Sequence, residues 1–165
     1  MEDRHDPRAA RLEKLARLRE RGIEPYPYRF RPSHGAAALI AAGEALLASG
    51  AAVSLAGRVM ARRDMGKAAF AHVKDGAARL QVYVRQDVVG AEAFELFGLI
   101  DLGDYLGLHG TMMRTRTGEL TLRVERLELL AKAIRPLPVP KVELRDGEQV
   151  VHDAVHDVEF RYRQR

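Results

Sequence analysis

Between residues 53 and 85 the chain alternates apolar and polar side chains in three short stretches, and this period of two constrains its fold most strongly. Successive side chains of a β-strand point to opposite faces, so the alternation predicts three half-buried strands, at 53–63, 67–74 and 78–85. The dipeptide DG at 75–76 favours a tight hairpin turn between the last two. In the first strand the alternation places Val53, Leu55, Gly57 and Val59 inward and Ser54, Arg58, Met60 and Arg62 outward.

Two further strands are predicted at 101–115 and 119–132, around the polar turn RTRTG, and a short helix at 90–100 precedes them. This order, with one helix between the third and fourth of five strands, is that of the OB fold, a small Greek-key barrel. Other small barrels also contain five short strands, and the position of the helix favours the OB fold. We therefore expect a mainly β protein with a five-stranded OB-fold barrel over residues 51–133.

Helices are expected before the barrel, within an N-terminal arm and linker over residues 1–50. Residues 7–21 carry three leucines spaced three apart, which is typical of a narrow amphipathic helix. This helix either packs its leucines on the barrel or acts as an arm that contacts RNA or a second subunit, and the two interpretations are compatible. Residues 36–48 predict a short Ala/Leu helix that covers the core.

A proline-rich linker is expected over residues 134–165, after the barrel. Proline lacks a backbone donor, so Pro136, Pro138 and Pro140 preclude a regular element around them. The remainder of this segment has too little apolar content for a second core. Its end, RYRQR, falls where we would expect a new element to begin.

The basic residues are concentrated in one part of the sequence. The 165-residue chain has a net charge of +4, yet residues 58–85 contain seven basic and two acidic residues, so the rest of the chain sums to −1. Such a local excess is expected where one surface meets a polyanion. The absence of cysteine excludes disulfides and thiolate zinc sites and favours a cytoplasmic location. No apolar run approaches the roughly 20 residues of a membrane span.

Phe70 lies on the charged side of its predicted strand, opposite to the small apolar residues on either side of it. Pairing across the hairpin brings Phe70 against Gln81 or Tyr83, and either register leaves the same residues on the shared face. That face holds Phe70, His72, Lys74, Arg79, Gln81, Tyr83 and Arg85. Bases of single-stranded nucleic acid stack on aromatic rings while cations follow the phosphates, so the face predicts such binding. The alternative is that the N-terminal helix or linker covers Phe70.

Glu119 stands at the start of the last predicted strand, near this basic surface. A carboxylate there repels phosphate, but it can accept a hydrogen bond from a base edge such as the N3–H of uracil. Gln81 can pair with uracil in a similar way. The alternative for Glu119 is an ion pair within the turn, with Arg114 or Arg116.

No catalytic constellation is visible in the sequence. Glycine-rich phosphate loops, GxSxG and HExxH are absent, and MGKAAF lacks the first glycine and the hydroxyl residue of a phosphate loop. In HDAVHD, His152 and His156 are spaced to chelate a metal on a helix, but no third ligand is near. We favour a solvated linker there and expect neither a metal site nor catalytic residues.

Several stretches together resemble the N-terminal, anticodon-binding domain of bacterial lysyl-tRNA synthetases, which are class II enzymes. They cover most of the chain at family-like spacing: KLARLRERGIEPYPYRF, VSLAGRVMARRDMGKAAF, RLQVY, DLGDYLGLHG, RTRTGELTL, LLAKAIRPLP and VEFRYRQR. The chain departs from the family pattern at Ala69, where serine is frequent, and in VVHDAVHD, which enlarges the linker. Aspartyl and asparaginyl enzymes share the OB fold but resemble this combination less.

The resemblance implies roles for individual residues. In the family an aromatic residue stacks on the central base of a uridine-rich anticodon, while a glutamine and a glutamate read base edges. By motif these roles fall on Phe70, Gln81 and Glu119, and Arg63 matches a family arginine near the anticodon. The full set of expected RNA-binding residues is Arg62, Arg63, Lys67, Phe70, His72, Arg79, Gln81, Tyr83, Arg114, Arg116 and Glu119.

The resemblance also implies an activity and partners. The expected partner is the anticodon stem-loop of tRNA(Lys). The full-length family enzyme is expected to be a homodimer and to attach lysine to tRNA with ATP and magnesium. In the family RYRQR leads into the catalytic domain, so we expect this chain alone to need no cofactor and to charge no tRNA. Two other functions stay open: a stand-alone single-strand-binding OB protein, and a domain that serves mainly in dimerisation.

Overall fold

The protein forms two compact units, Met1–Arg135 and Pro136–Arg165, and each is described here by itself. The computed structural model describes residues 6–76, 78–137, 141–145 and 148–152. Among them, none of the helices is both long enough and apolar enough to cross a membrane.

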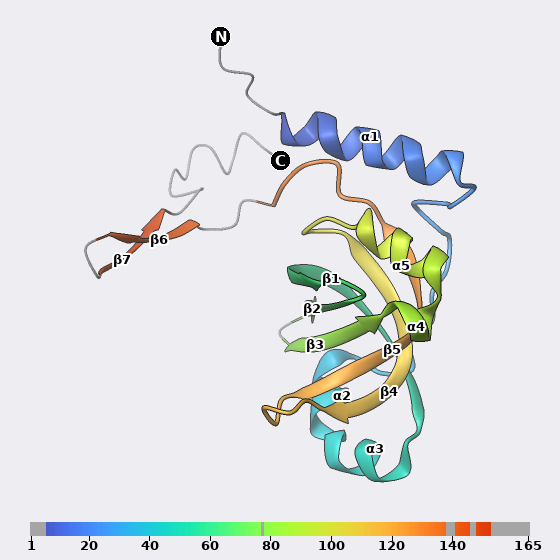
Figure 1. The fold of residues 1–165 in the computed structure, drawn as a ribbon. Helices are drawn as coiled ribbons and strands as arrows, with labels where there is room; N and C mark the ends of the chain where they lie inside the picture. Colours follow the sequence, from blue (N-terminus) through green and yellow to red (C-terminus); the bar gives the residue numbers. More distant parts are fainter. Residues whose placement is uncertain (1–5, 77, 138–140, 146–147, 153–165) are drawn as a thin grey trace. The chain divides into compact units, whose positions relative to one another are not determined.

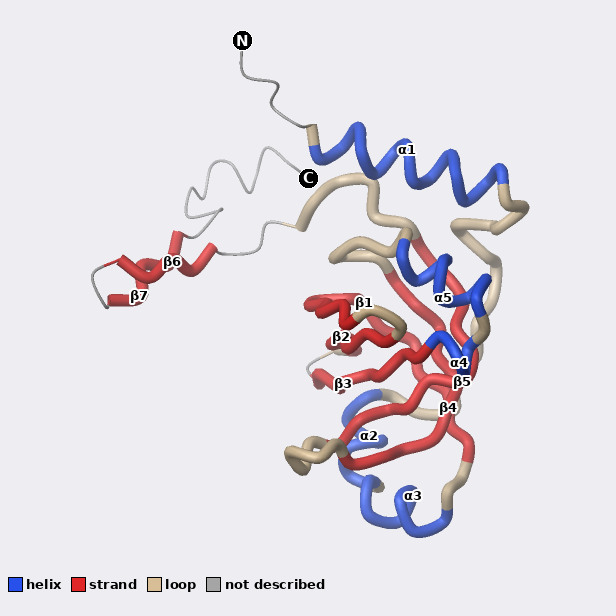
Figure 2. Tube along the Cα trace, viewed as in Figure 1, coloured by secondary structure: helices blue, strands red, loops and turns tan. Residues whose placement is uncertain are grey.

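The first unit is built on a closed barrel of five strands (Figures 1 and 2). The strands are β1 (Ala52–Met65), β2 (Ala68–Asp75), β3 (Ala78–Arg85), β4 (Tyr105–Arg114) and β5 (Leu120–Ala131). Around the barrel they follow the order β1-β2-β3-β5-β4, with β4 closing on β1, and only the β3–β5 pair among them is parallel. This is the expected OB fold.

Small and branched apolar residues fill the interior of the barrel, as the period of two predicts. On β2, Ala69, Ala71 and Val73 are buried, and on the paired strand so are Leu80, Val82 and Val84. Side chains on one face of a sheet must share the interior, so the residues between them are turned outward. Phe70, His72, Gln81 and Tyr83 therefore lie on the outer face of this hairpin.

A bulge in β1 changes which face of the strand Arg62 and Arg63 occupy. The pairing with β2 shifts between Val59 and Ala61, so Ala61 lies opposite His72 and Arg63 opposite Phe70. One extra residue in a strand reverses which side chains point outward beyond it. The sequence-based assignment of Arg62 to the outer face was therefore wrong: Arg62 pairs with Ala71, on the inner side, and Arg63 is on the face of Phe70.

Five helices surround the barrel in the described part of the first unit. They are α1 (Pro7–Glu20), α2 (Ala36–Ala41), α3 (Gly43–Ser49), α4 (Gln86–Val89) and α5 (Ala91–Gly98). The expected helix at 36–48 is divided at Ala42, where Gly43 packs so closely on Leu120 that a side chain would meet it. Helix α4 was not predicted, because its four residues are too few to show a helical period.

Helix α1 packs on the barrel through part of its leucine stripe. Leu15 and Leu18 are buried, whereas Leu12 is 40% exposed. Asp6 caps its first turn by accepting a hydrogen bond from the Arg8 amide at 2.9 Å. The guanidinium of Arg11 donates to the carbonyls of Leu102, Ala133 and Arg135, which ties the helix to the end of the barrel.

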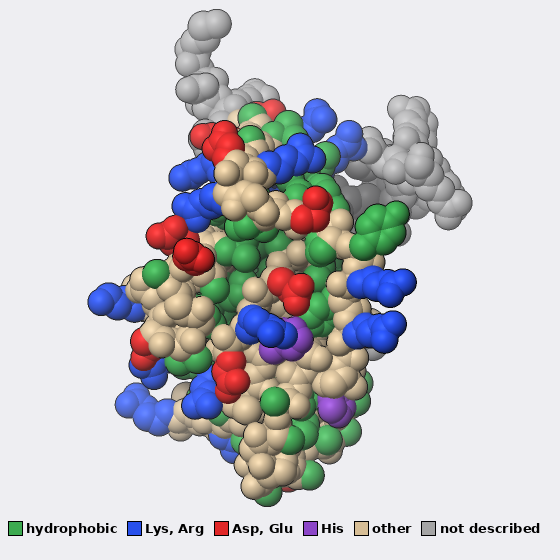
Figure 3. Space-filling view, turned by 90° about the vertical axis from the view of Figure 1, so that its right-hand side faces the viewer, with side chains coloured by type: hydrophobic (Ala, Val, Ile, Leu, Met, Phe, Trp, Pro, Cys, Tyr) green, Lys and Arg blue, Asp and Glu red, His purple; other side chains and the backbone are tan. Residues whose placement is uncertain are grey.

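The segment between α1 and α2 crosses β4 and β1 on the outside of the barrel and reaches Asp75 at the end of β2. The ring of Phe30 lies directly over Gly107 of β4, where a Cβ would come within 2.4 Å of it, and it meets the His109 ring edge-on at 5.2 Å. On the side of the molecule that carries α4 and α5, basic and acidic side chains are interspersed (Figure 3). Arg21 and Glu95 form such an exposed pair, at 3.0 Å.

The second unit contains an antiparallel hairpin of β6 (Lys141–Arg145) and β7 (Glu148–His152). From the sequence this range was expected to be a linker without strands, and the hairpin corrects that expectation. The signals were present, because Val142 and Leu144 alternate with charged residues and the sequence DG follows at 146–147. The prolines at 138 and 140 lie outside the described residues.

Candidate nucleic-acid interface

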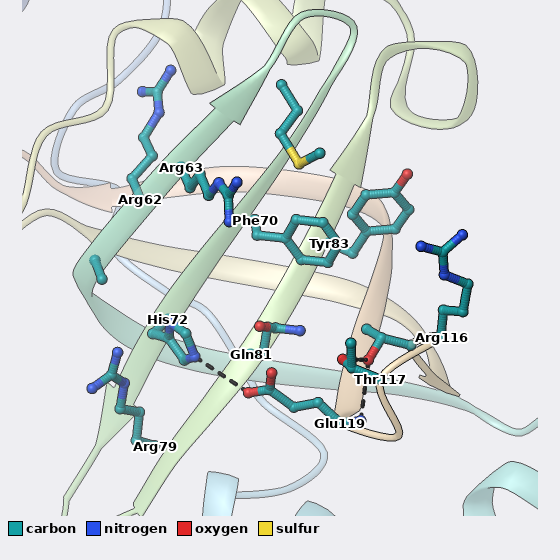
Figure 4. Close-up of a pocket in the computed structure, with 13 residues that line it drawn as sticks. Arg62, Arg63, Phe70, His72, Arg79, Gln81, Tyr83, Arg116, Thr117 and Glu119 are labelled. Atoms are coloured by element: carbon teal, nitrogen blue, oxygen red, sulfur yellow. Dashed lines mark hydrogen bonds and ion pairs between the residues drawn. The ribbon is translucent and has the colours of Figure 1, made fainter.

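An open pocket of about 960 Å³ lies on the outer face of β2 and β3 (Figure 4). The β4–β5 turn and the end of β1 form its sides. Its lining residues are Ala61, Arg62, Arg63, Met65, Phe70, His72, Arg79, Gln81, Tyr83, Thr115, Arg116, Thr117 and Glu119. Nine of the eleven residues expected to bind RNA are thus brought together, from the consecutive strands β1 to β3 and from the β4–β5 turn more than 30 residues further along the chain.

Two aromatic rings form one wall of the pocket. Phe70 and Tyr83 are register partners on β2 and β3, and their rings stack with centroids 4.5 Å apart and planes at 25°. Among the described residues, neither α1 nor the segment that follows it lines the pocket. The N-terminal helix and linker therefore do not cover Phe70, and its ring faces the open pocket.

Arg62 and Arg63 differ in what their guanidinium groups contact. Arg62 donates to the carbonyls of Phe97 and Ile100 at 2.6 and 3.0 Å, and stacks over the Phe97 ring at 4.7 Å, so it holds the end of α5. Arg63 makes no hydrogen bond or ion pair with another described residue, and it lies beside Phe70 in Figure 4. Both arginines line the pocket, but the guanidinium of Arg62 is held by the scaffold, whereas that of Arg63 has no such partner among the described residues.

Gln81 lies on the pocket floor, opposite His72 on β2 and Thr121 on β5. Its Nε2 donates to the hydroxyl of Thr121 at 2.9 Å. That hydroxyl in turn donates to the Glu119 carbonyl at 3.2 Å. A side-chain amide held in this way offers hydrogen-bonding groups to the pocket in a defined orientation.

Hydrogen bonds within the β4–β5 turn fix the position of Glu119. The amide of Glu119 donates to the Thr115 hydroxyl at 3.1 Å, and the Thr115 amide donates to the Glu119 carbonyl at 3.0 Å. Gly118 takes a φ of +87°, in the region that favours glycine, to close the turn. The Glu119 carboxylate then meets Nε2 of His72 at 3.4 Å.

Glu119 pairs with neither of the two arginines that were its alternative partners, Arg114 and Arg116, and Arg114 is engaged elsewhere. Arg114 pairs with Glu44 of α3 and donates to the Gly118 carbonyl at 2.9 Å, so it braces the turn and does not line the pocket. Lys67 is also outside; it lines a neighbouring hollow of about 530 Å³. That hollow shares Met65 and Tyr83 with the main pocket.

Three pocket arginines, Arg63, Arg79 and Arg116, form no ion pair with any other described residue. Glu119 is the single carboxylate among the lining residues. Positive charge that has no internal partner is available to a polyanion, so the pocket combines stacking surface, unpaired cations and a few fixed polar groups.

Sequence reasoning missed the three threonines, Thr115, Thr117 and Thr121. Threonine in a turn or strand carries no signal of its own, and Thr121 owes its role to a parallel pairing between β3 and β5 that no local pattern reveals. Among the described residues, no group of three or more histidine, aspartate or glutamate side chains is arranged to hold a metal. The sequence HDAVHD lies outside the described residues from position 153 onward.

Comparison with known proteins places this pocket in a wider context. A family model for tRNA anticodon binding, described as an OB-fold nucleic acid binding domain, matches residues 53–130. A lysine–tRNA ligase of Pelotomaculum thermopropionicum is 44% identical over 164 residues, which are 99% of this chain and 30% of that protein. The lysine–tRNA ligase of Enterococcus faecalis is 42% identical over all of this chain and 32% of its own length. That of Variovorax paradoxus is 47% identical over 86% of this chain and 29% of its own length.

Proposed function

We propose that the pocket of this chain, which belongs to the family of OB-fold nucleic acid binding domains, reads a uridine-rich anticodon. It would do so as the anticodon-binding region of a lysine–tRNA ligase. The observation that carries the proposal is the single open face on which stacked aromatics, an oriented amide, a carboxylate and unpaired arginines meet. The natural ligand is the anticodon stem-loop of a lysine tRNA.

Each part of the pocket has a task in this proposal. The central base stacks on the free side of Phe70, with Tyr83 behind the Phe70 ring. This stacking contributes about 1–3 kcal/mol to the free energy of binding. Uracil carries one N–H between two carbonyl oxygens, so the acceptors of Gln81 and Glu119 suit its N–H. The arginines Arg63, Arg79 and Arg116 neutralise phosphates of the loop.

The chain spans about 30% of the length of the ligases it matches. We propose that the whole protein attaches lysine to its tRNA in the cytoplasm, with ATP and magnesium, and that it acts as a dimer. Residues 134–165 would then join the barrel to the part that performs catalysis. The described residues offer no fitting site for ATP or magnesium, because they contain neither a phosphate loop nor a carboxylate cluster. No catalytic step is assigned to them.

Binding of a fluorescently labelled anticodon hairpin tests the proposal. We expect the UUU hairpin to bind in a salt-sensitive manner, because released counterions drive the association. A hairpin with another base in place of the central uridine should bind more weakly. Equal affinity for the two hairpins would contradict the reading of uridine.

Competition with poly-dT separates this function from that of a general single-strand-binding protein. A domain that reads an anticodon loop should release the hairpin only at a large excess of poly-dT. Efficient competition at equal nucleotide concentration would favour the general binder, which stacks on any base.

A further inference from the structure

The side-chain amide of Gln81 has an acceptor at one end and a donor at the other, so its orientation decides which pyrimidine it matches. With the oxygen toward the base, it accepts from N3–H of uracil, and a free N–H can donate to the neighbouring carbonyl. Turned by 180°, the amide instead donates to the bare N3 of cytosine and accepts from its exocyclic amine. Whatever fixes this orientation therefore distinguishes uridine from cytidine.

Thr121 is placed to fix it. It lies directly opposite Gln81 in the parallel β3–β5 pair, and its side chain is completely buried, at 0% exposure. Its Oγ1 is 2.9 Å from Nε2 of Gln81 and 3.2 Å from the carbonyl oxygen of Glu119.

The hydrogen-bonding capacity of a hydroxyl favours one orientation of the Gln81 amide. A hydroxyl carries one hydrogen, and a carbonyl oxygen can only accept, so the Thr121 hydrogen points to Glu119. Toward Gln81 the hydroxyl can then only accept, which requires the NH₂ end of the amide. A flipped amide would bring two acceptors together, or would draw the hydroxyl away from Glu119 and leave that bond unmade.

The oxygen end of Gln81 is consequently turned away from Thr121. In Figure 4 this end lies on the side of His72, and no described residue donates a hydrogen bond to it. Thr121 uses one of the two hydrogens on Nε2, and the second stays available. The amide thus presents an acceptor and a donor next to each other, which is the complement of the N3–H and O4 edge of uracil.

We propose that Thr121 is a positioning residue that selects uridine over cytidine at the central base, the one that stacks on Phe70 and is read by Gln81. This inference rests on the proposed anticodon function. Thr121 does not touch the RNA. It acts through the orientation of Gln81, and through the same hydroxyl it couples that orientation to the turn that carries Glu119.

The test uses the whole chain and two anticodon hairpins that differ only in uridine or cytidine at the central position. Thr121→Val removes the hydroxyl at nearly constant shape, and Thr121→Ser keeps it. The quantity measured is the dissociation constant of the cytidine hairpin divided by that of the uridine hairpin. We expect Thr121→Val to reduce this ratio by roughly two- to tenfold, the equivalent of one net hydrogen bond. Thr121→Ser should keep the ratio of the unmodified protein.

The outcomes separate this inference from the proposed function. An unchanged ratio in Thr121→Val, or an equal loss in Thr121→Ser, overturns the role of Thr121 while the anticodon function stands. A ratio near one in the unmodified protein overturns both.

A measurement on the unmodified protein keeps the inference testable should Thr121→Val fail to fold. In the NMR spectrum, we expect one Nε2 proton of Gln81 to exchange slowly with solvent and the other to shift when the uridine hairpin binds. Equally fast exchange of both protons in the free protein would overturn the inference.

Discussion

The pocket and the end of the barrel next to α1 both concentrate charge, but they are built in opposite ways. In the pocket, Arg63, Arg79 and Arg116 have no ion-pair partner among the described residues. At the barrel end, Lys132 is completely buried and its ammonium meets Asp101 at 2.6 Å and Asp104 at 2.7 Å. A buried charge is tolerated only when an opposite charge or hydrogen bonds compensate it, whereas an exposed charge is solvated by water and stays available to a ligand.

This group, which we call the junction cluster, consists of the buried Asp104 and Lys132 and the partly exposed Lys14 and Asp101. Lys14 comes from α1, the two aspartates from the turn before β4, and Lys132 from the end of β5. Asp104 also accepts from the Ala133 amide at 2.7 Å. The cluster therefore fixes the N-terminal helix and the exit of the chain from the barrel at one point. The charges of the junction cluster are paired with one another, whereas the pocket arginines Arg63, Arg79 and Arg116 have no ion-pair partner among the described residues.

Removing the buried ammonium should have the largest effect. We expect Lys132→Met to lower the free energy of unfolding by about 3–5 kcal/mol, because it leaves Asp104 buried without its counter-charge. Urea denaturation followed by circular dichroism measures this. In the pocket, Arg116→Met should change the same quantity by less than about 0.5 kcal/mol. Similar losses of unfolding free energy in the two variants would contradict the contrast between the junction cluster and the pocket.

Truncating the stacking platform should have the next largest effect, on binding and not on folding. We expect Phe70→Ala to weaken binding of the uridine-rich hairpin by about 1–3 kcal/mol, because a base loses its stacking surface. Tyr28→Ala is the matched control, since Tyr28 is fully exposed and does not line the pocket. If both variants bind as the unmodified protein does, Phe70 is not the platform.

A single pocket charge should produce a smaller change, visible in the salt dependence. We expect Arg116→Gln to reduce the slope of log K against log salt by about 0.7, the value for one phosphate contact in a single strand. Arg123→Gln removes the same charge from a residue that pairs with Glu125 outside the pocket, and it should leave the slope unchanged. A slope that falls equally in both would point to net charge alone.

The smallest expected effect is the acid sensitivity of the junction cluster. Burial by itself would raise the pKa of Asp101, but the hydrogen bonds and charges of Lys132 and Lys14 outweigh it and lower that pKa below its ordinary value. A carboxyl with a lowered pKa stabilises the fold above its unfolded pKa of about 3.9, and this contribution is lost as the pH falls through the folded pKa.

The free energy of unfolding should therefore decrease below about pH 4, and less steeply in Asp101→Asn than in the unmodified protein. Denaturation with urea at a series of acidic pH values measures both slopes. Identical slopes would mean that Asp101 does not titrate in the way its contacts imply. The pocket control, Glu119→Gln, tests whether an exposed carboxylate behaves differently.

Much of the barrel and its binding face could be predicted from the sequence because the information is local. The period of two marks which residues of β2 and β3 face the core, and a DG turn fixes the hairpin between them. Phe70 and Tyr83 must then share the outer face in any register that keeps the interior apolar. The position of one helix between the third and fourth strands was enough to favour the OB fold.

The tertiary structure alone decided how individual side chains are used within that frame. The bulge in β1 turns Arg62 toward the carbonyls at the end of α5 and leaves Arg63 on the face of Phe70. Arg114 pairs with Glu44 and does not line the pocket, and Gln81 donates to Thr121 of the parallel strand β5. Side-chain periodicity reports only which face a residue occupies. Which partner it meets there depends on strand pairings between distant segments, and these form only when the whole barrel closes.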